Sequence, residues 1–287
     1  MGFGIALGGG GTRGAAHVGV LLALHEEGLV PQSVAGTSAG AIVGGLYAAG
    51  HTPEQLKKMV YNLTQNGRLL MDFDIIGILK GVAQIMTRKE LTLSGLMKGE
   101  RLLEFLIKET GGISISDCSM PVVIPAVDLS SGRTIAYTNK AAGKPRILDI
   151  LWRDSVILGE ACSASAAVPI AFRPRKIGKY TLLDGGLTDN LPVSLLAAAG
   201  ENSILAVDIS ESYEPPEKEN ILEIASHSLS IMGKRLRQCA GQGERLLLNI
   251  KLPENTNFLD FSHMTNTMRV GYEAAKHMMP VMRALLT

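Results

Sequence analysis

The stretch "VAGTSAGAIVG", residues 34–44, decides the fold, because an apolar run there gives way to a serine between two glycines and then to small residues. Residues 36–40 match the pattern GxSxG with Ser38 at its centre. A serine on a sharp turn from a strand into a helix is raised above the sheet, and Gly36 and Gly40 avoid crowding in that strained turn. The pattern also arises by chance in glycine-rich sequence. Ser38 is therefore either a nucleophile or a small residue in a tight turn.

The first 50 residues alternate between short apolar runs and helical patterns. Residues 3–7 are apolar and end in four glycines, and residues 33–36 form a second brief run. Residues 13–27 carry apolar side chains at helical spacing, and residues 39–49 continue as a helix of small residues. This alternation predicts a parallel sheet with helices on its faces.

Later parts of the chain extend the same scheme. A polar stretch with two prolines, residues 210–220, predicts a surface loop before a helix over 221–238. With 287 residues, of which 46% are hydrophobic, the chain can bury a full core. We expect an α/β fold, a three-layer α/β/α sandwich around a mainly parallel sheet, in one domain over residues 1–287. Further strands are expected where β-branched apolar residues recur, at 122–127, 180–183, 204–209 and 246–250.

Composition argues against several classes of partner and cofactor. Lys and Arg number 28 against 27 Asp and Glu, and this net charge of +1 gives no general reason to expect nucleic acid or a strongly anionic membrane. Cys118, Cys162 and Cys239 have no metal-like spacing, which indicates reduced packing thiols and a cytoplasmic location. No basic n-region precedes Arg13, as a signal peptide would require. We expect no metal and no cofactor, and the sequence specifies no oligomeric state.

Residues 28–53 contain no Asp, Glu, Lys or Arg, and Gly36, Gly40 and Gly44 have the GxxxG spacing of transmembrane helix dimers. Polar residues and Pro31 interrupt this stretch, which leaves fewer than the ~20 predominantly apolar residues that a membrane span needs. A spanning helix is therefore disfavoured.

Residues 69–90 form a less regular apolar segment, in which Gly77 and Gly81 weaken a helical pattern. The main expectation is a helix packed on the core. The alternative is a mobile cap that meets acyl chains or makes peripheral contact with a membrane. The residues that share one helical face are Ile75, Ile78, Leu79, Val82, Ile85 and Met86.

The glycine-rich loop in "LGGGGTRGAAH", residues 7–17, satisfies GxGxxG at Gly9, Gly11 and Gly14, between a strand and a helix. A dinucleotide site also needs an acidic residue about 20 positions further on, and residues 28–53 supply none. The loop retains a simpler property. Its backbone N–H groups converge at a helix N-terminus, where they can hold an anion such as a transient oxyanion.

Asp184 lies in "LLDGGLTDNLPV", residues 182–193, directly after an apolar strand and before two glycines. Its carboxylate can lie at the carboxyl edge of the sheet, where open α/β folds place their sites. The alternative is an ordinary Asp-Gly-Gly turn.

Taken together, these segments resemble the patatin-like phospholipase family. Order and spacing agree from about residue 3 to 195, and residues 200–287, which are expected to complete the fold, resemble bacterial members more loosely. The matching segments are Gly9-Gly10-Gly11-Thr12-Arg13-Gly14 for the oxyanion loop, residues 36–40 for the nucleophile elbow, "ASAAVP" at 164–169, and Asp184-Gly185-Gly186 with Asn190 and Pro192 for the Asp motif.

The resemblance implies a serine esterase or lipid acyl hydrolase with a Ser-Asp dyad, acting on phospholipid or lysophospholipid acyl esters. Ser38 would attack the ester carbonyl, Asp184 would take its proton, and water would later release the acyl group. A carboxylate with its free pKa of ~4 is a poor base at neutral pH, so burial should raise that pKa or geometry should compensate. The implied oxyanion donors are the N–H groups of Gly9, Gly10 and Gly11, with support from Arg13, Gly36, Gly40, Gly185 and Gly186.

Other residues compete for these roles. A Ser-acid-His triad could use His263 or His277, the latter in a helical pattern over 268–286. However, that fold needs several strands before its elbow, and only two fit before Ser38. Asp128, Asp154, Asp189 and Asp208 are weaker candidates for the base, and Ser165 is a nominal alternative nucleophile because no elbow surrounds it.

Two functions from other classes stay open at this point. One is a catalytically weak lipid-binding or regulatory protein with the same fold. The other is a nucleotide-binding protein that uses residues 9–14.

Overall fold

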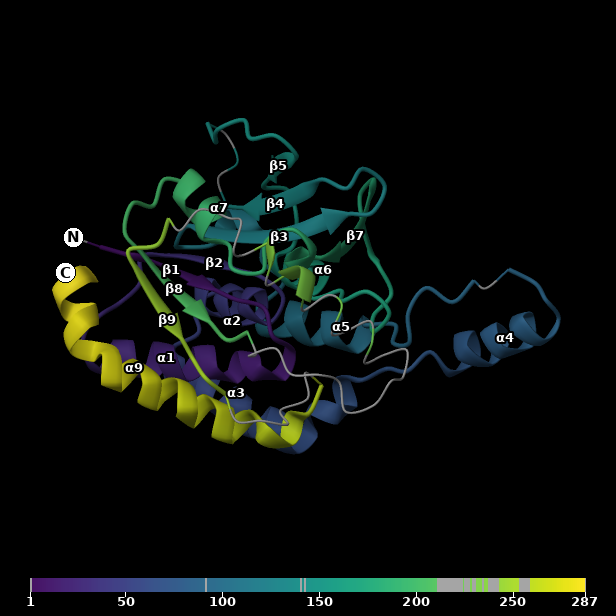
Figure 1. Cartoon of the computed structure of the whole chain (residues 1–287), viewed down its shortest axis with the longest axis horizontal. Helices are drawn as coiled ribbons and strands as arrows, with labels where there is room; N and C mark the ends of the chain where they lie inside the picture. The colour runs from purple at the N-terminus through teal and green to yellow at the C-terminus, as the bar shows by residue number, and fades with distance from the viewer. Residues whose placement is uncertain are drawn as a thin grey trace.

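A nine-stranded mixed sheet forms the centre of the molecule in the computed structural model, which describes residues 2–90, 92–139, 141, 143–210, 224, 228, 231–233, 235–236, 243–252 and 259–286. The main path of the sheet has the order β5-β4-β3-β2-β1-β8-β9, and β7 branches from β3 and carries β6 (Figure 1). The strands are β1 (Gly4–Leu7), β2 (Ser33–Gly36), β3 (Val122–Asp128), β4 (Thr134–Thr138), β5 (Ile150–Arg153), β6 (Arg175–Ile177), β7 (Tyr180–Asp184), β8 (Ile204–Asp208) and β9 (Leu246–Asn249).

Most neighbouring strands are parallel, as the sequence predicted. The parallel pairs are β1–β2, β1–β8, β2–β3, β8–β9 and β4–β5, whereas β3–β4, β3–β7 and β6–β7 are antiparallel. The central strands β1, β2 and β8 are buried along their whole length, which explains their continuous apolar sequence. Because β8 and β9 extend the sheet beyond β1, the C-terminal part of the chain continues the sheet that the motif strands begin. The single domain over residues 1–287 stays a prediction.

Helices cover both faces of the sheet and give the expected three layers. In Figure 1, α1, α3 and α9 lie on one side of the sheet and α7 lies on the other. The two faces bury separate apolar clusters, with Ile5 and Leu7 on the first face and Ala6 with Leu195 of α7 on the second. The longer helices are α1 (Ala15–Glu26), α2 (Ala39–Ala48), α3 (Pro53–Asn66), α4 (Ile75–Met86), α5 (Glu100–Glu109), α6 (Leu158–Ser165), α7 (Val193–Ala198) and α9 (Met264–Leu286).

Helix α9 packs closely on α1 because both helices carry a glycine at the crossing. A Cβ on Gly19 would lie 2.0 Å from the carbonyl oxygen of Met268, and one on Gly271 would lie 2.2 Å from that of Ala16. Exposed ion pairs from Glu27 to Lys276 and Arg283 join the same two helices. The final helix is thus an integral layer on the side of the sheet that carries α1.

The prediction that a helix in residues 69–90 packs on the core was wrong. A helix does form, over Ile75–Met86, but it projects away from the body of the molecule instead of packing on the core (Figure 1). Gly81 is its one buried residue, and its apolar side chains other than the half-buried Ile78 are exposed. The buried position thus holds a glycine and the exposed positions hold apolar residues, which is the reverse of a core helix.

The predicted loop at 210–220 and helix at 221–238, together with Cys239, lie for the most part outside the described residues. Within the described part of the chain, no helix combines the length and the apolar character that crossing a membrane requires.

Candidate functional site

Ser38 occupies a strained turn between β2 and α2. Its φ of 54° and ψ of −117° are rare for a residue with a side chain, and its exposed fraction is 7%. A Cβ on Gly36 would lie 2.1 Å from the carbonyl oxygen of Gly40, and a Cβ on Gly40 would lie 2.1 Å from that of Leu7. Both glycines are therefore needed for the turn to close against β1, and the GxSxG stretch has the geometry of a nucleophile elbow.

Hydrogen bonds to the side chain of one distant residue and to the main chain of another hold this turn. The N–H of Ser38 donates to Oγ of Ser165 at 3.0 Å, and Oγ1 of Thr37 donates to the carbonyl oxygen of Asp189 at 2.8 Å. Ser165 is fully buried at the end of α6. From the sequence, Ser165 was expected to be no more than a nominal alternative nucleophile. Its place in "ASAAVP", between the elbow and the Asp motif, was the signal that could have indicated a supporting role.

Asp184 reaches the elbow through the register of β3. Strand β4 occupies one edge of β3, so β2 and β7 share the other edge, with Ala35 beside Val123 and Asp184 beside Ala126. Because β2 is parallel to β3 and β7 is antiparallel, their C-terminal ends approach each other. This meeting of two strand ends brings Ser38 and Asp184 together across 146 residues of sequence.

The carboxyl group of Asp184 is buried and only partly hydrogen-bonded. Oδ1 accepts the N–H of Gly186 at 2.7 Å, while Oδ2 has no partner of standard hydrogen-bond geometry among the described residues. Burial raises the pKa of Asp184 to about 6, and the nearby Ser38 hydroxyl and the Gly186 N–H oppose that rise. The carboxylate is therefore a stronger base than a solvated aspartate, and Oδ2 is available to take a proton.

The glycine loop lies beside this pair, but its N–H groups are not equivalent. The N–H of Gly9 donates to the carbonyl oxygen of Asn190 at 3.0 Å, whereas those of Gly10 and Gly11 have no protein partner in the described part of the chain. Gly9 is needed for another reason, since a Cβ there would lie 3.2 Å from Cβ of Ser38 and 2.4 Å from Oδ1 of Asn190. The loop thus presents two donors, at the start of the 3-10 turn Gly11–Gly14.

Arg13 and His17 fix the shape of the loop from inside the protein. Nε of Arg13 donates to the carbonyl oxygen of Gly10 at 2.9 Å, so this side chain contacts the backbone of the loop. Nε2 of His17 donates to the carbonyl oxygen of Gly8 at 2.8 Å. Burial lowers the pKa of His17 to about 4, so this imidazole is neutral. The sequence analysis did not identify His17, although it follows the loop by one helical turn.

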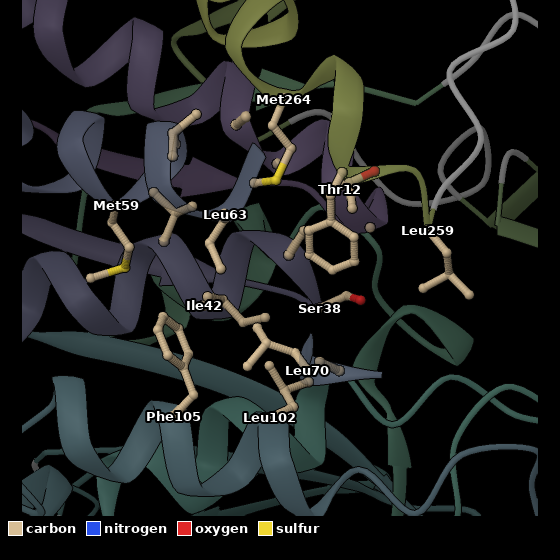
Figure 2. A pocket seen from close by; sticks show the side chains of 18 of the residues that line it. Thr12, Ser38, Ile42, Met59, Leu63, Leu70, Leu102, Phe105, Leu259 and Met264 are labelled. Atoms are coloured by element: carbon tan, nitrogen blue, oxygen red, sulfur yellow. The ribbon is translucent and has the colours of Figure 1, made fainter. Parts of the chain in front are cut away.

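An apolar cavity of about 140 Å³ is lined in part by Ser38 and extends between α2, α3 and α5. Figure 2 shows the Ser38 hydroxyl at one part of this pocket, with Ile42 and Leu63 between it and Met59 and Phe105 in this view. No charged side chain lines it within the described part of the chain, and apolar side chains dominate its wall. Such a cavity can enclose a hydrocarbon chain and excludes ionic groups.

The comparison with protein families identifies this arrangement. The model described as patatin-like phospholipase matches residues 5–197. The chain belongs to the patatin-like phospholipase family. The matched residues include all four segments on which the resemblance was based.

Individual relatives agree with the family and differ widely in size. An uncharacterized NTE family protein of Mycobacterium bovis is 29% identical over 216 residues, which are 75% of this chain and 51% of the relative. The lysophospholipase NTE1 of Mycosarcoma maydis is 32% identical over 73% of this chain and 10% of its own length. This member of the family thus spans about half the length of the first relatives.

A solved structure supports the fold of this patatin-like chain. VipD from Legionella pneumophila has a TM-score of 0.53 and 13% sequence identity, with 99% of this chain and 67% of VipD covered. At this identity the likeness concerns the fold alone.

Competing candidates lie elsewhere in this patatin-like structure. His277 is exposed on α9, and His263 forms a salt bridge with Asp260. Neither histidine lines the cavity among its described lining residues. Asp128 accepts from Ser131 in a turn, and no group of three His, Cys, Asp or Glu side chains in the described residues is arranged to hold a metal ion.

Proposed function

We propose that this chain hydrolyses carboxylic ester bonds of lipids, with Ser38 as the nucleophile and Asp184 as the general base. The observation that carries the proposal is the strained Ser38, which lines an apolar cavity, beside a buried carboxylate whose Oδ2 has no standard hydrogen bond among the described residues. The family of the chain supports the same reaction.

In the first step, Oγ of Ser38 attacks the ester carbonyl carbon, and its proton passes to Oδ2 of Asp184. The N–H groups of Gly10 and Gly11 stabilise the negative charge on the carbonyl oxygen. The intermediate then expels the alcohol, which takes the proton from Asp184, and an acyl-enzyme remains. In the second half, water gives its proton to Asp184 and attacks the acyl carbon, and the fatty acid leaves as Ser38 recovers the proton.

The shape of the site supports a fatty acyl substrate. The cavity wall next to Ser38 consists of side chains such as Ile42, Leu63 and Phe105, so the acyl chain would be buried and the alcohol portion would stay outside. We propose that phospholipids or lysophospholipids supply this acyl ester. We also place the protein in the cytoplasm, because Cys118 and Cys162 are free buried thiols.

A binding protein without catalysis is the second candidate, because the apolar cavity alone could hold a lipid. Reaction with a fluorophosphonate separates the two functions. The hydrolase should label at Ser38, and Ser38→Ala should not label. A protein that binds lipid without hydrolysis would show neither labelling nor turnover.

The decisive experiment is hydrolysis of esters of increasing acyl length by the parent and by Ser38→Ala, Asp184→Asn and His277→Ala. The first two substitutions should lower kcat by at least about a thousandfold, because nucleophile and base act as a unit. His277→Ala is the matched control and should leave kcat unchanged. Near-parent activity in Asp184→Asn would contradict the Ser-Asp dyad. Loss of activity in His277→Ala would instead favour a Ser-acid-His triad.

A further inference from the structure

Helix α4 stands away from the body of the protein on a short two-stranded base (Figure 1). Phe73 and Met97 form an antiparallel bridge in this base. The N–H of Asp74 donates to the carbonyl oxygen of Leu96 at 2.8 Å, and that of Lys98 donates to Asp72 at 3.0 Å. The segment from 72 to 98 is thus a hairpin that carries α4 at its outer part.

The helix directs its apolar side outward. Gly81 is buried, and the side chain of Gln84 bonds to Thr92 on the returning segment, so the side with glycines and polar groups faces the hairpin itself. The apolar residues cover roughly half of the helix circumference. Those exposed between 51% and 80% are Ile75, Ile76, Leu79, Val82, Ile85 and Met86.

The base of the hairpin is firmly joined to the rest of the protein. Asp74 forms a salt bridge with Arg173, and Met97 is 1% exposed. The N–H of Met97 donates to the carbonyl oxygen of Ala171 at 2.8 Å, and the N–H of Arg173 donates back to Met97 at 2.9 Å. The helix is therefore held in a defined position relative to the segment that follows α6.

The same base adjoins the acyl cavity. Leu70 and Met71, which immediately precede the hairpin, line the cavity, and so does Phe172, which bridges to Met97. The exposed apolar surface of α4 is thus connected along the chain, through the base of the hairpin, with the wall of the cavity that Ser38 lines.

We propose that α4 inserts its exposed apolar side into a lipid surface and docks the protein there. A half-apolar helix with cations on it or directly beside it is typical of helices that lie in a membrane interface. Lys80, Arg88 and Lys89 are cationic, against the single anion Glu90, in residues 75–90. This charge favours phosphate head groups. The docking of α4 does not depend on the proposed hydrolysis. Only the use of docking, which is to bring lipid esters to Ser38, rests on that proposed function.

The test measures co-sedimentation of the protein with vesicles, in a Ser38→Ala background so that hydrolysis cannot alter the lipid. Vesicles of phosphatidylcholine with phosphatidylglycerol are compared with vesicles of phosphatidylcholine alone. Leu79→Gln with Met86→Gln removes two exposed apolar side chains and keeps helix propensity. The control, Leu129→Gln with Leu148→Gln, removes two side chains of similar exposure outside the hairpin.

We expect the α4 variant to bind the anionic vesicles roughly tenfold more weakly or worse, and the control variant to bind like the parent. Vesicles without phosphatidylglycerol should bind the parent several-fold more weakly, because three cations adjoin the surface. Equal binding by both variants would overturn the proposal. So would a dimer in solution that Leu79→Gln with Met86→Gln dissociates while vesicles do not bind.

Activity separates failure of docking from failure of the proposed hydrolysis. In a chain with Ser38 intact, the α4 variant should hydrolyse a soluble short-chain ester at the parent rate and lose activity only on vesicles. Parent-level activity of the α4 variant on vesicles would contradict the docking proposal and would leave the proposed hydrolysis intact. Absence of Ser38-dependent hydrolysis in the parent contradicts the proposed function and leaves the sedimentation result valid.

Discussion

At the scale of single residues, the site depends on a carboxylate that the fold keeps out of water. Burial raises the pKa of Asp184 to about 6, whereas a histidine base would start from a pKa of about 6.5. An aspartate with this pKa can therefore serve the role that histidine has in serine triads. Burial thus gives Asp184 a pKa that a solvated aspartate does not have.

The first prediction concerns the pH dependence of activity. The base must be deprotonated to accept the Ser38 proton, so kcat/KM should fall as the pH drops through about 6 and should level off above 7. A profile of soluble-ester hydrolysis between pH 4 and 9 measures this. A decline centred near pH 4 would mean that Asp184 titrates as a solvated carboxyl group.

The same pKa predicts a gain of stability when the charge is removed. The folded-state pKa of Asp184 lies above its ordinary value of 3.8, so the stability that the protonated carboxyl group contributes is fully present below pH 3.8 and is lost as the pH rises through about 6. At pH 8 the lost contribution is at most about 3 kcal/mol. Asp184→Asn, which keeps the acceptor for Gly186, should therefore unfold at higher urea concentration than the parent at pH 8 but not at pH 4.

Asp128 provides the matched control for this measurement. Burial acts to raise its pKa, but hydrogen bonds from Ser131 and Thr181 outweigh burial and lower it. Asp128→Asn should therefore lose stability at pH 8 relative to the parent, opposite in sign to Asp184→Asn. Identical behaviour of the two variants would contradict the assigned environments.

Ser165 gives a prediction about positioning. Ser165→Ala leaves the N–H of Ser38 buried without its acceptor and should lower the free energy of unfolding by about 1–3 kcal/mol. Because the nucleophile loses its support and the acyl cavity is unchanged, kcat should fall by about ten- to a hundredfold while KM stays near the parent value. Steady-state kinetics and urea unfolding test both parts. A rise in KM at constant kcat would contradict the positioning role.

At the scale of elements, the glycines of α2 show why GxxxG spacing did not signify a membrane helix. Gly40 faces the backbone of Leu7 in β1, and Gly44 faces the side chain of Val34 in β2. Small residues let the helix approach two buried strands closely, as they let membrane helices approach each other. The GxxxG spacing therefore indicates close packing, and the packing partner of α2 is the β-sheet.

This difference predicts unequal effects of two alanine substitutions in one helix. A Cβ at Gly40 would lie 2.1 Å from a backbone oxygen, whereas a Cβ at Gly44 would lie 2.9 Å from a methyl group of Val34. Gly40→Ala should cost several kcal/mol or prevent folding. Gly44→Ala should cost about 1 kcal/mol or less, since helix propensity offsets the contact. Urea unfolding of both variants measures the contrast, and equal costs would contradict the packing of α2 on β1.

Strands with continuous apolar runs could be predicted from the sequence, whereas strands without such runs were missed. Strands β1, β2, β3, β7, β8 and β9 fall within or beside the expected runs. Strands β4, β5 and β6 were not expected; β5 is only half-buried and carries Arg153, and β6 carries Arg175 and Lys176. The antiparallel direction of β7 also could not be predicted, because apolar alternation is the same in either direction.

At the scale of the whole molecule, the candidate site could be predicted only as separate motifs. Ser38, Asp184 and the glycine loop were each identified from local patterns, and the register of β3 explains their meeting. The assignment of N–H groups within the loop depended on Asn190, which lies far away in sequence. Helix α4 was predicted to pack on the core, and this was wrong. The apolar face of a helix has the same periodicity whether a protein core or another apolar medium covers it.

Helix α9 has a consequence for the timing of biosynthesis. Met264, at its start, forms part of the wall of the acyl cavity, and the helix is fixed to α1 through Gly19 and Gly271. During translation, Ser38 and Asp184 leave the ribosome before residues 264–286. The wall of the cavity is therefore complete only after α9 has docked on α1. We expect the proposed hydrolysis of long acyl chains to begin only at that stage.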